Sequence, residues 1–251
     1  MKVGNFILVL LCTLLVAAVS IGAAPLPKRC AEVSIVNSFA APEPPHGLTF
    51  DGEYLYVAGH IYTPDPSNIY KLDMAGNVIS SFVGPGHVTG LAYKDGNIWA
   101  ATDWELTIFE LSPSGDVLRS FQAPGTDSTG LVFQNNALWN ADFNWGESVA
   151  YLHRIKITGN KVQVKTYESP GPGPEGLAYD GSHLWHVDIN TSKLYRLNSA
   201  AKVMCEYDVP TLTGGDVWGT GVAPIGLTFD GTYLWMSTQD NAMIYQLDIG
   251  K

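Results

Sequence analysis

One short sequence pattern recurs five times along this chain. Each copy has a Gly-Leu pair, a few residues, a tight turn and an aromatic-rich segment, as in PHGLTFDGEYLYVA and PIGLTFDGTYLWMS. The glycines of the five copies, spaced 40 to 50 residues apart, are Gly47, Gly90, Gly130, Gly176 and Gly226. A period of this length, with several short strands per unit, is typical of the blades of a β-propeller. The chain is therefore predicted to be an all-β protein, a five-bladed β-propeller.

Each repeat predicts four antiparallel strands, which we call A to D in chain order. Strand A carries alternating apolar residues, and a tight turn such as Asp51-Gly52 joins it to strand B. Strand B has an aromatic residue at a fixed position, and strand C reads IYKLD or LYRLN. An aromatic residue that is present in every repeat is best explained by packing between blades.

The fifth repeat stops inside strand C, at residues 247–249, so its strand D is missing. Residues 33–39, near the start of the chain, resemble strand D of the first repeat at 77–82. We expect this segment to pair beside residues 243–249 and close the ring. Closure would remove an exposed sheet edge between the first and last blades.

Residues 1–24 have the features of a secretory signal peptide: Lys2, an apolar run, then small residues. An uncleaved membrane anchor is the alternative, but the run is short for a membrane span. The remainder, 25–251, is predicted to be one propeller domain, secreted to the extracellular space or periplasm, with no membrane segment after cleavage. In an oxidising compartment, Cys30 and Cys205 are expected to form a disulfide beside the ring's closure, two free thiols being the alternative.

The chain is acidic, with 14 Lys and Arg against 24 Asp and Glu and a formal net charge of −10. Such a charge disfavours nucleic acid and anionic membrane surfaces as partners. Cations, cationic groups and neutral polar ligands suit it better, and the expected partner is a small molecule, a sugar or a peptide. We expect a monomer.

The order of antiparallel strands sorts the loops between two faces of the ring. The A–B and C–D turns are short and regular, whereas the B–C and D–A loops vary and share the other face, where a site is more often built. We call the centre of that face the channel mouth. The position before each strand A glycine should lie near it, and there His46 and Glu175 replace the Thr or Ile of the other repeats.

The ends of the five B strands place further polar side chains on this face. They are His60, Asp103, Asp142, Asp188 and Asp240. Asp103, Asp142 and Asp188 are candidate ligands of a cation such as Ca²⁺, which prefers oxygen donors. The alternative is that each aspartate caps the backbone of its own loop. No other cofactor is suggested.

Three tryptophans fall outside the repeated aromatic position, in loops of the same face: Trp104, Trp145 and Trp218. With His46 and His60, they are the candidate ligand-binding residues, because loop tryptophans beside carboxylates can stack on a sugar or a cationic group. The alternative is that they cover the channel or pack on a neighbouring loop.

The third and fourth repeats contain Thr129-Gly130-Leu131, Gly146-Glu147-Ser148 and Glu175-Gly176. In these motifs the chain resembles the secreted glutamine cyclotransferases of plant and bacterial type. The resemblance implies a five-bladed propeller that closes N-terminal glutamine into pyroglutamate, with Glu175 as a catalytic carboxylate. Two positions depart from the family: Thr129 replaces a glutamine, and Asn140 replaces a carboxylate, with Asp142 two residues on. More distantly, the chain is similar to lactonase-like and streptogramin-lyase-like propellers.

Three functions are consistent with these features. The first is a non-catalytic propeller that binds a ligand at its channel mouth, and the second is a glutaminyl-peptide cyclase with Glu175 and Asp142 as catalytic residues. The third, a metal-assisted lyase or lactonase, requires several oxygen ligands focused at the mouth. An enzyme of the second kind needs Glu175 and Asp142 beside a common pocket.

Overall fold

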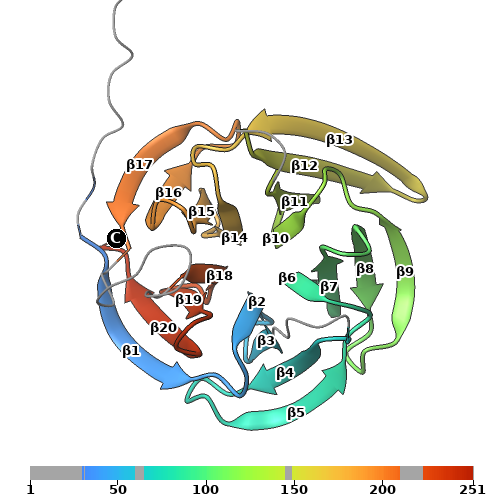
Figure 1. Ribbon diagram of the computed structural model, residues 1–251, viewed down its shortest axis with the longest axis horizontal. Coiled ribbons are helices and arrows are strands. Elements are labelled where there is room, and N and C mark those ends of the chain that lie inside the picture. Colours follow the sequence, from blue (N-terminus) through green and yellow to red (C-terminus); the bar gives the residue numbers. More distant parts are fainter. Residues whose placement is uncertain (1–29, 31, 60–64, 145–148, 210–222, 251) are drawn as a thin grey trace, which may run out of the picture.

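The structure is a computed structural model that describes residues 30, 32–59, 65–144, 149–209 and 223–250. Five four-stranded antiparallel sheets stand as blades around a central axis (Figure 1). The fold predicted from the repeats, a five-bladed β-propeller, is confirmed.

Within each blade the chain runs outward from the axis, one strand after another. Blade one comprises β2 (Pro45–Phe50), β3 (Leu55–Gly59), β4 (Asn68–Leu72) and β5 (Val78–Val83). Blade two comprises β6 (Val88–Lys94), β7 (Asn97–Thr102), β8 (Thr107–Leu111) and β9 (Val117–Gln122). Blade three comprises β10 (Ser128–Gln134), β11 (Ala137–Asp142), β12 (Tyr151–Thr158) and β13 (Lys161–Glu168). Blade four comprises β14 (Pro174–Tyr179), β15 (Leu184–Asp188), β16 (Lys193–Leu197) and β17 (Val203–Asp208).

Blade five joins the two ends of the chain, as predicted. It consists of β18 (Pro224–Phe229), β19 (Leu234–Thr238), β20 (Met243–Asp248) and β1 (Ser34–Ala40), the last being its outermost strand. β1 pairs antiparallel with β20, from Ser34 opposite Asp248 to Ala40 opposite Met243. In Figure 1 the first strand lies along the outer side of the last one. The ring is therefore closed by backbone hydrogen bonds.

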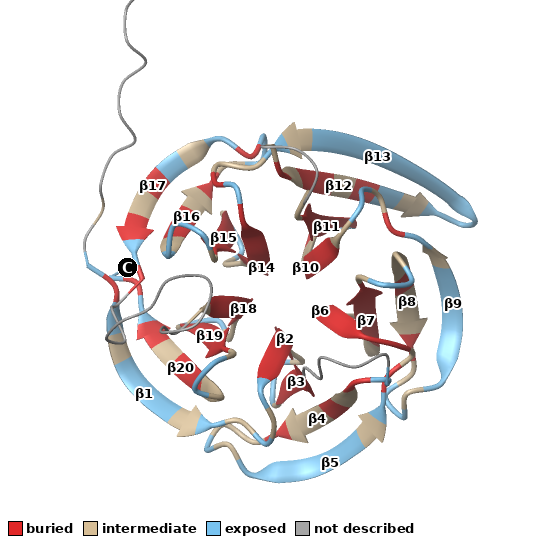
Figure 2. Ribbon diagram, viewed as in Figure 1, coloured by how far each residue is buried: buried red, intermediate tan, exposed pale blue. Residues whose placement is uncertain are grey.

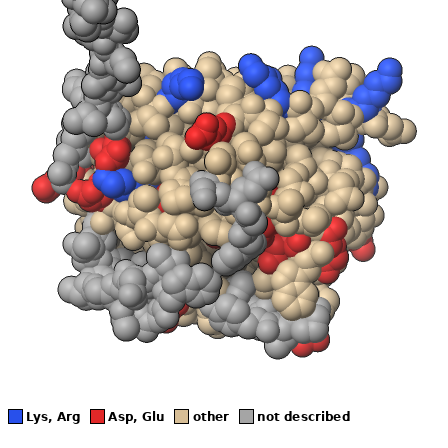
Figure 3. Space-filling model, turned by 45° about the horizontal axis from the view of Figure 1, so that its top comes forward, with Lys and Arg blue, Asp and Glu red and all other residues tan. Residues whose placement is uncertain are grey.

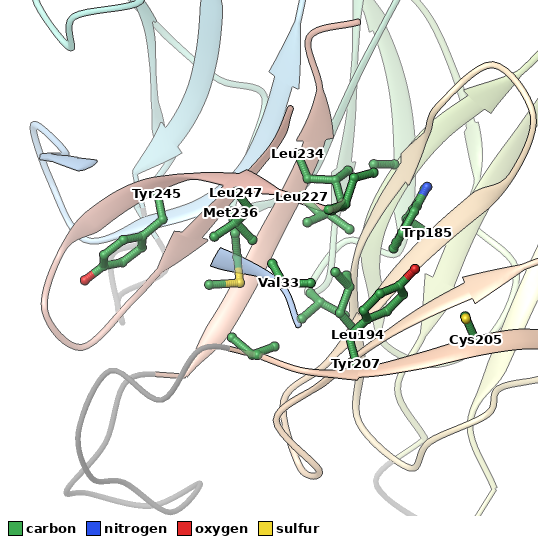
Figure 4. Packing of buried hydrophobic residues seen from close by; sticks show 14 residues of the cluster. Val33, Trp185, Leu194, Cys205, Tyr207, Leu227, Leu234, Met236, Tyr245 and Leu247 are labelled. Atoms are coloured by element: carbon green, nitrogen blue, oxygen red, sulfur yellow. The ribbon is translucent and has the colours of Figure 1, made fainter. Parts of the chain in front are cut away.

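Burial falls from the axis outward (Figure 2). The innermost strands are almost wholly buried. The outermost strands are largely exposed, except β17, in which Cys205 and Tyr207 are buried. The repeated aromatic residue of strand B packs against the next blade, as predicted. For example, Trp139 clusters with Leu177 and Leu184 of blade four, and Trp185 with Leu227 and Leu234 of blade five. Figure 4 shows the cluster between blades four and five, to which Val33 also contributes.

The glycine of each strand A lies where neighbouring blades touch backbone to backbone. A Cβ added to any of the five would come within 3.0 Å of a backbone atom of the next blade's strand A. For Gly130 that atom is the carbonyl oxygen of Glu175, and for Gly226 it is that of His46. The cavity enclosed by these glycines and their leucines leaves only about 10 Å³ for the centres of water molecules. The axis is thus nearly closed at this level, because the cavity has room for only about one water molecule.

Cys30 and Cys205 form the expected disulfide, with their Cα atoms 5.7 Å apart. It links the segment before β1 to β17 of blade four across a separation of 175 residues. The predicted signal peptide lies outside the described residues and stays a prediction. Among the described residues, no helix is long and apolar enough to cross a membrane.

We predict that Gly130→Ala lowers the free energy of unfolding by about 3 kcal/mol, because its Cβ would meet backbone that cannot move aside. Gly159→Ala is the control: its Cβ meets open space, and its positive φ should make the change cost about 1 kcal/mol. Urea unfolding of both variants measures the difference. Equal losses would show that the close approach of the inner strands is unimportant.

We also predict that the double variant Cys30→Ser/Cys205→Ser loses about 2–4 kcal/mol of stability, because the bond restricts a long loop in the unfolded chain. The reduced wild-type protein should unfold at the same urea concentration as the variant. If the oxidised wild type, the reduced wild type and the variant all unfold at the same urea concentration, the disulfide does not stabilise the closed ring.

Candidate functional site

The residues before the strand A glycines are placed by a β-bulge in each inner strand. In blade four, Pro174 pairs with Asp188 and Leu177 with His186, and the register shifts between them, at Glu175 and Gly176. The same shift occurs in blades one, three and five, and in blade two a shift at this place skips Thr89 alone, since Gly90 pairs with Ala101. The residue before the glycine is thus released from regular pairing with strand B, at the mouth end of the strand.

Two of these five residues serve the fold. The hydroxyl of Thr89 donates to the backbone oxygens of Ser128 (2.6 Å) and Ala101 (3.2 Å). The hydroxyl of Thr129 donates to the backbone oxygen of Pro174 (2.9 Å). The bonds to Ser128 and Pro174 each tie one blade to the next, which explains threonine at this position.

His46 and Glu175 approach each other although their blades are not neighbours. His46 Nε2 lies 3.7 Å from Glu175 Oε2, and the two residues are 6% and 9% exposed. Blade five separates their strands in the ring, so the side chains meet across the mouth. The sequence-based expectation that these two side chains lie together at the mouth agrees with this geometry.

Glu175 is in surroundings that favour its protonated form. Burial raises its pKa well above the ordinary value, and the charges of Asp127, Asp188 and Asp103 raise it further. A buried carboxyl with this property can hold a proton at a pH where most carboxyls have lost it. A carboxyl with a raised pKa in a cleft is a candidate for giving or taking a proton.

Asp142 is committed to the loop that precedes β10. Its Oδ1 accepts the backbone N–H groups of Thr126 (2.8 Å) and Asp127 (2.9 Å), and its Oδ2 lies 3.3 Å from His153 Nε2. It is 1% exposed. This carboxylate thus positions Asp127, one of the charges that act on Glu175.

Asp188 has the same task in blade four. Its Oδ2 accepts the backbone N–H of Gly173 (2.8 Å), and its Oδ1 accepts both the N–H and the hydroxyl of Thr191 (2.8 Å each). Nearby His186 is wholly buried, and burial lowers its pKa to about 4 against the opposing charge of Asp188. His186 is therefore neutral in the neutral pH range.

In blade two, the aspartate at the end of strand B pairs with a histidine. His87 Nδ1 donates to Asp103 Oδ1 (2.7 Å), which also accepts the backbone N–H of Trp104 (2.8 Å). Trp104 is 55% exposed, and its ring centroid lies 5.4 Å from that of His87. This is the one loop tryptophan of the three candidates within the described residues, since Trp145 and Trp218 lie outside them, as does His60.

The aspartates at the ends of the B strands accept backbone N–H groups of nearby loops, which is the alternative to cation binding. Asp240, for example, accepts the N–H of Ala223 (3.2 Å). In the part of the chain that the structure describes, no three His, Cys, Asp or Glu side chains lie close enough together to hold a metal ion. Ca²⁺ binding by Asp103, Asp142 and Asp188 stays a prediction.

Asn140, the position where the resemblance implies a carboxylate, is buried in β11. Its Nδ2 donates to Ser128 Oγ (2.9 Å) and to the backbone oxygens of Ala141 (3.0 Å) and Gly130 (3.3 Å). It stabilises the bulge of blade three. Glu147 and Ser148, also part of the resemblance, lie outside the described residues.

Sequence reasoning missed Asp127, His87 and His153. Asp127 and His87 lie in D–A loops, whose variable sequences offer no repeat against which an exception stands out. His153 could have been found, because it occupies the place in strand C where the other repeats carry an aromatic residue.

No family model matches this chain, and no curated protein matches its sequence. Solved structures do match in fold. The glutaminyl cyclase of Myxococcus xanthus aligns with a TM-score of 0.69 at 13% identity, covering 88% of this chain and 97% of the cyclase. A streptogramin B lyase aligns at 0.53 and 19% identity, covering 86% and 97% of the two chains. A chain of a nidogen/laminin complex aligns at 0.53 and 18% identity, covering 77% and 72%.

The predicted resemblance to cyclase and streptogramin-lyase propellers is therefore confirmed for the fold.

The raised pKa of Glu175 predicts a pH-dependent effect of Glu175→Gln on stability. An acid whose native pKa is raised holds its proton to a higher pH in the native state than in the unfolded chain. Above the unfolded value of 4.5, wild-type stability should thus fall with rising pH until the native pKa is passed. Gln cannot ionise, so Tm of the variant minus Tm of the wild type should increase above about pH 4.5. A difference that decreases there would mean that Glu175 is a stabilising carboxylate.

Proposed function

We propose that the channel mouth binds the amino group of a peptide or small molecule at Glu175. The observation that carries this proposal is the buried Glu175 carboxyl, 3.7 Å from His46, within reach of the charges of Asp127, Asp188 and Asp103. An ammonium group that enters this acidic surrounding would be attracted by the charges of Asp127, Asp188 and Asp103. It would also offset the repulsion that disfavours ionised Glu175.

The charge and the aromatic groups of the protein support a cationic ligand. Acidic residues outnumber basic ones by 24 to 14. In the view of Figure 3 most basic side chains lie along the upper edge, and acidic side chains gather at the left and the lower right, with one basic side chain among those at the left. The exposed indole of Trp104 offers a surface on which an adjacent part of the ligand can stack. A sugar that carries an amino group would satisfy the same contacts as a peptide N-terminus.

A second candidate function is the cyclisation of N-terminal glutamine. In that reaction the α-amino nitrogen bonds to the side-chain amide carbon, the amide C–N bond breaks, and ammonia leaves. One proton must pass from the attacking amine to the leaving nitrogen. A buried carboxyl whose pKa is raised by burial and by neighbouring acidic charges is suited to carry it, and Glu175 has that property.

The fold shared with the Myxococcus xanthus glutaminyl cyclase supports this candidate. Asp142, our other predicted catalytic residue, is bound to backbone N–H groups and His153. In this proposal it positions the loop of Asp127, and the proton transfer falls to Glu175, with His46 beside it.

Binding is tested by isothermal titration with glutaminamide, with its acetylated form as the uncharged comparison. We expect only the free amine to bind, and Glu175→Gln to weaken binding about tenfold, the effect of about 1.4 kcal/mol. Glu53→Gln is the matched control, because Glu53 is exposed on the A–B turn of the opposite face. Equal affinity of the two ligands, or an unaffected Glu175→Gln, would contradict the proposal.

Catalysis is tested on the same samples by mass spectrometry of a peptide with N-terminal glutamine. Cyclase activity predicts loss of one ammonia per peptide with the wild type and Glu53→Gln, and none with Glu175→Gln. Binding without loss of ammonia from any sample would leave the amine-binding proposal standing and exclude the cyclase.

A further inference from the structure

On the face opposite the channel mouth, a groove runs between blades two and three. Its volume is about 440 Å³, within the range of small-molecule sites. Its walls come from the A–B turns of both blades and the C–D turn of blade three, with Trp99, Arg119 and Lys156 among the lining residues. Nothing in the amine-binding proposal uses this groove.

Trp99 in this groove has a buried indole N–H without an acceptor. The residue is 3% exposed, and its Nε1 has no hydrogen-bond partner among the described residues. The equivalent tryptophans of three other blades do have one. Trp139 Nε1 donates to Gln134 (2.9 Å), Trp185 Nε1 to Asp180 (2.8 Å) and Trp235 Nε1 to Asp230 (2.7 Å).

The missing acceptor follows from one residue of the repeat. The acceptor always stands five positions before the tryptophan, and in blade two that position is Lys94, which can only donate. Gln134 and Lys94 are equivalent even in detail, since each ends its strand before a two-residue turn whose first residue has positive φ. The repeat geometry therefore directs the Trp99 N–H toward the Lys94 position, in the wall of the groove.

Cationic side chains surround that position. The Arg119 guanidinium carbon lies 5.1 Å from the centre of the Trp99 ring, and Lys94 Nζ lies 5.6 Å from that of Phe133. Arg119 pairs with Glu110 and Lys94 with Asp95 (3.2 Å), whereas the exposed Lys156 has no ion pair among the described residues. The groove thus has more positive than negative charge in a protein whose net charge is −10.

We propose that this groove is a second binding site, which takes a small organic anion with a carboxylate or phosphate group. The anion would lie between Lys94, Arg119 and Lys156, and one of its oxygens would accept the Trp99 N–H. Nε1 is covered in the structure, so the Lys94 side chain moves aside as the anion enters.

The Lys94→Gln variant tests the site, because it copies the acceptor that blade three supplies to Trp139. It should raise Tm by about 2–4 °C without ligand, since the N–H gains a partner. In isothermal titrations with citrate, glucuronate and inorganic phosphate, at ionic strength matched with chloride, at least one should bind the wild type. Citrate or glucuronate alone indicates a carboxylate site, and phosphate alone a phosphate site.

The affinity for that anion should fall about tenfold in Lys94→Gln and in Lys156→Gln. Lys165→Gln is the matched control, because it removes an equal charge from the neighbouring β13, outside the groove. The proposal is overturned if none of the three anions binds, if Lys94→Gln lowers Tm, or if Lys165→Gln weakens binding as much as Lys156→Gln. None of these results bears on amine binding at Glu175.

Discussion

The close approach of the five inner strands is the contact on which the rest of the structure depends. It requires a residue without Cβ in every repeat, because each glycine faces backbone of the next blade. The approach nearly closes the axis at the level of the glycines. The bulge that accommodates each glycine also releases the preceding residue from its strand partner, and so Glu175 and His46 can meet at the mouth.

The acidic residues at the channel mouth have two different roles. Asp142 and Asp188 use their oxygens on backbone N–H groups and hold the loops in place. Glu175 stands on an inner strand, where burial and the surrounding charges favour its protonated form. Carboxyl groups on the same face of the ring thus differ in role because of what each one touches.

The fold could be predicted almost completely from the sequence, because comparison of the five repeats identifies the strands, the turns and the segment that closes the ring. The sequence also singles out His46 and Glu175, since each breaks a repeated position. It could not reveal that one oxygen of Asp142 accepts the N–H groups of Thr126 and Asp127, because that depends on loop conformation. The missing acceptor of the Trp99 N–H could have been predicted from Lys94 alone. That prediction would have required knowing that the acceptor stands five positions before the tryptophan.

The central claim is that Glu175 is a buried, protonatable carboxyl at the mouth and not a permanently charged partner of His46. The most direct measurement is an NMR titration of ¹³C-labelled glutamate carboxyls, in which Glu175→Gln identifies the resonance of Glu175. We predict a midpoint clearly above the ordinary value of 4.5. A midpoint at or below 4.5 would show a stably ionised carboxylate and contradict the account.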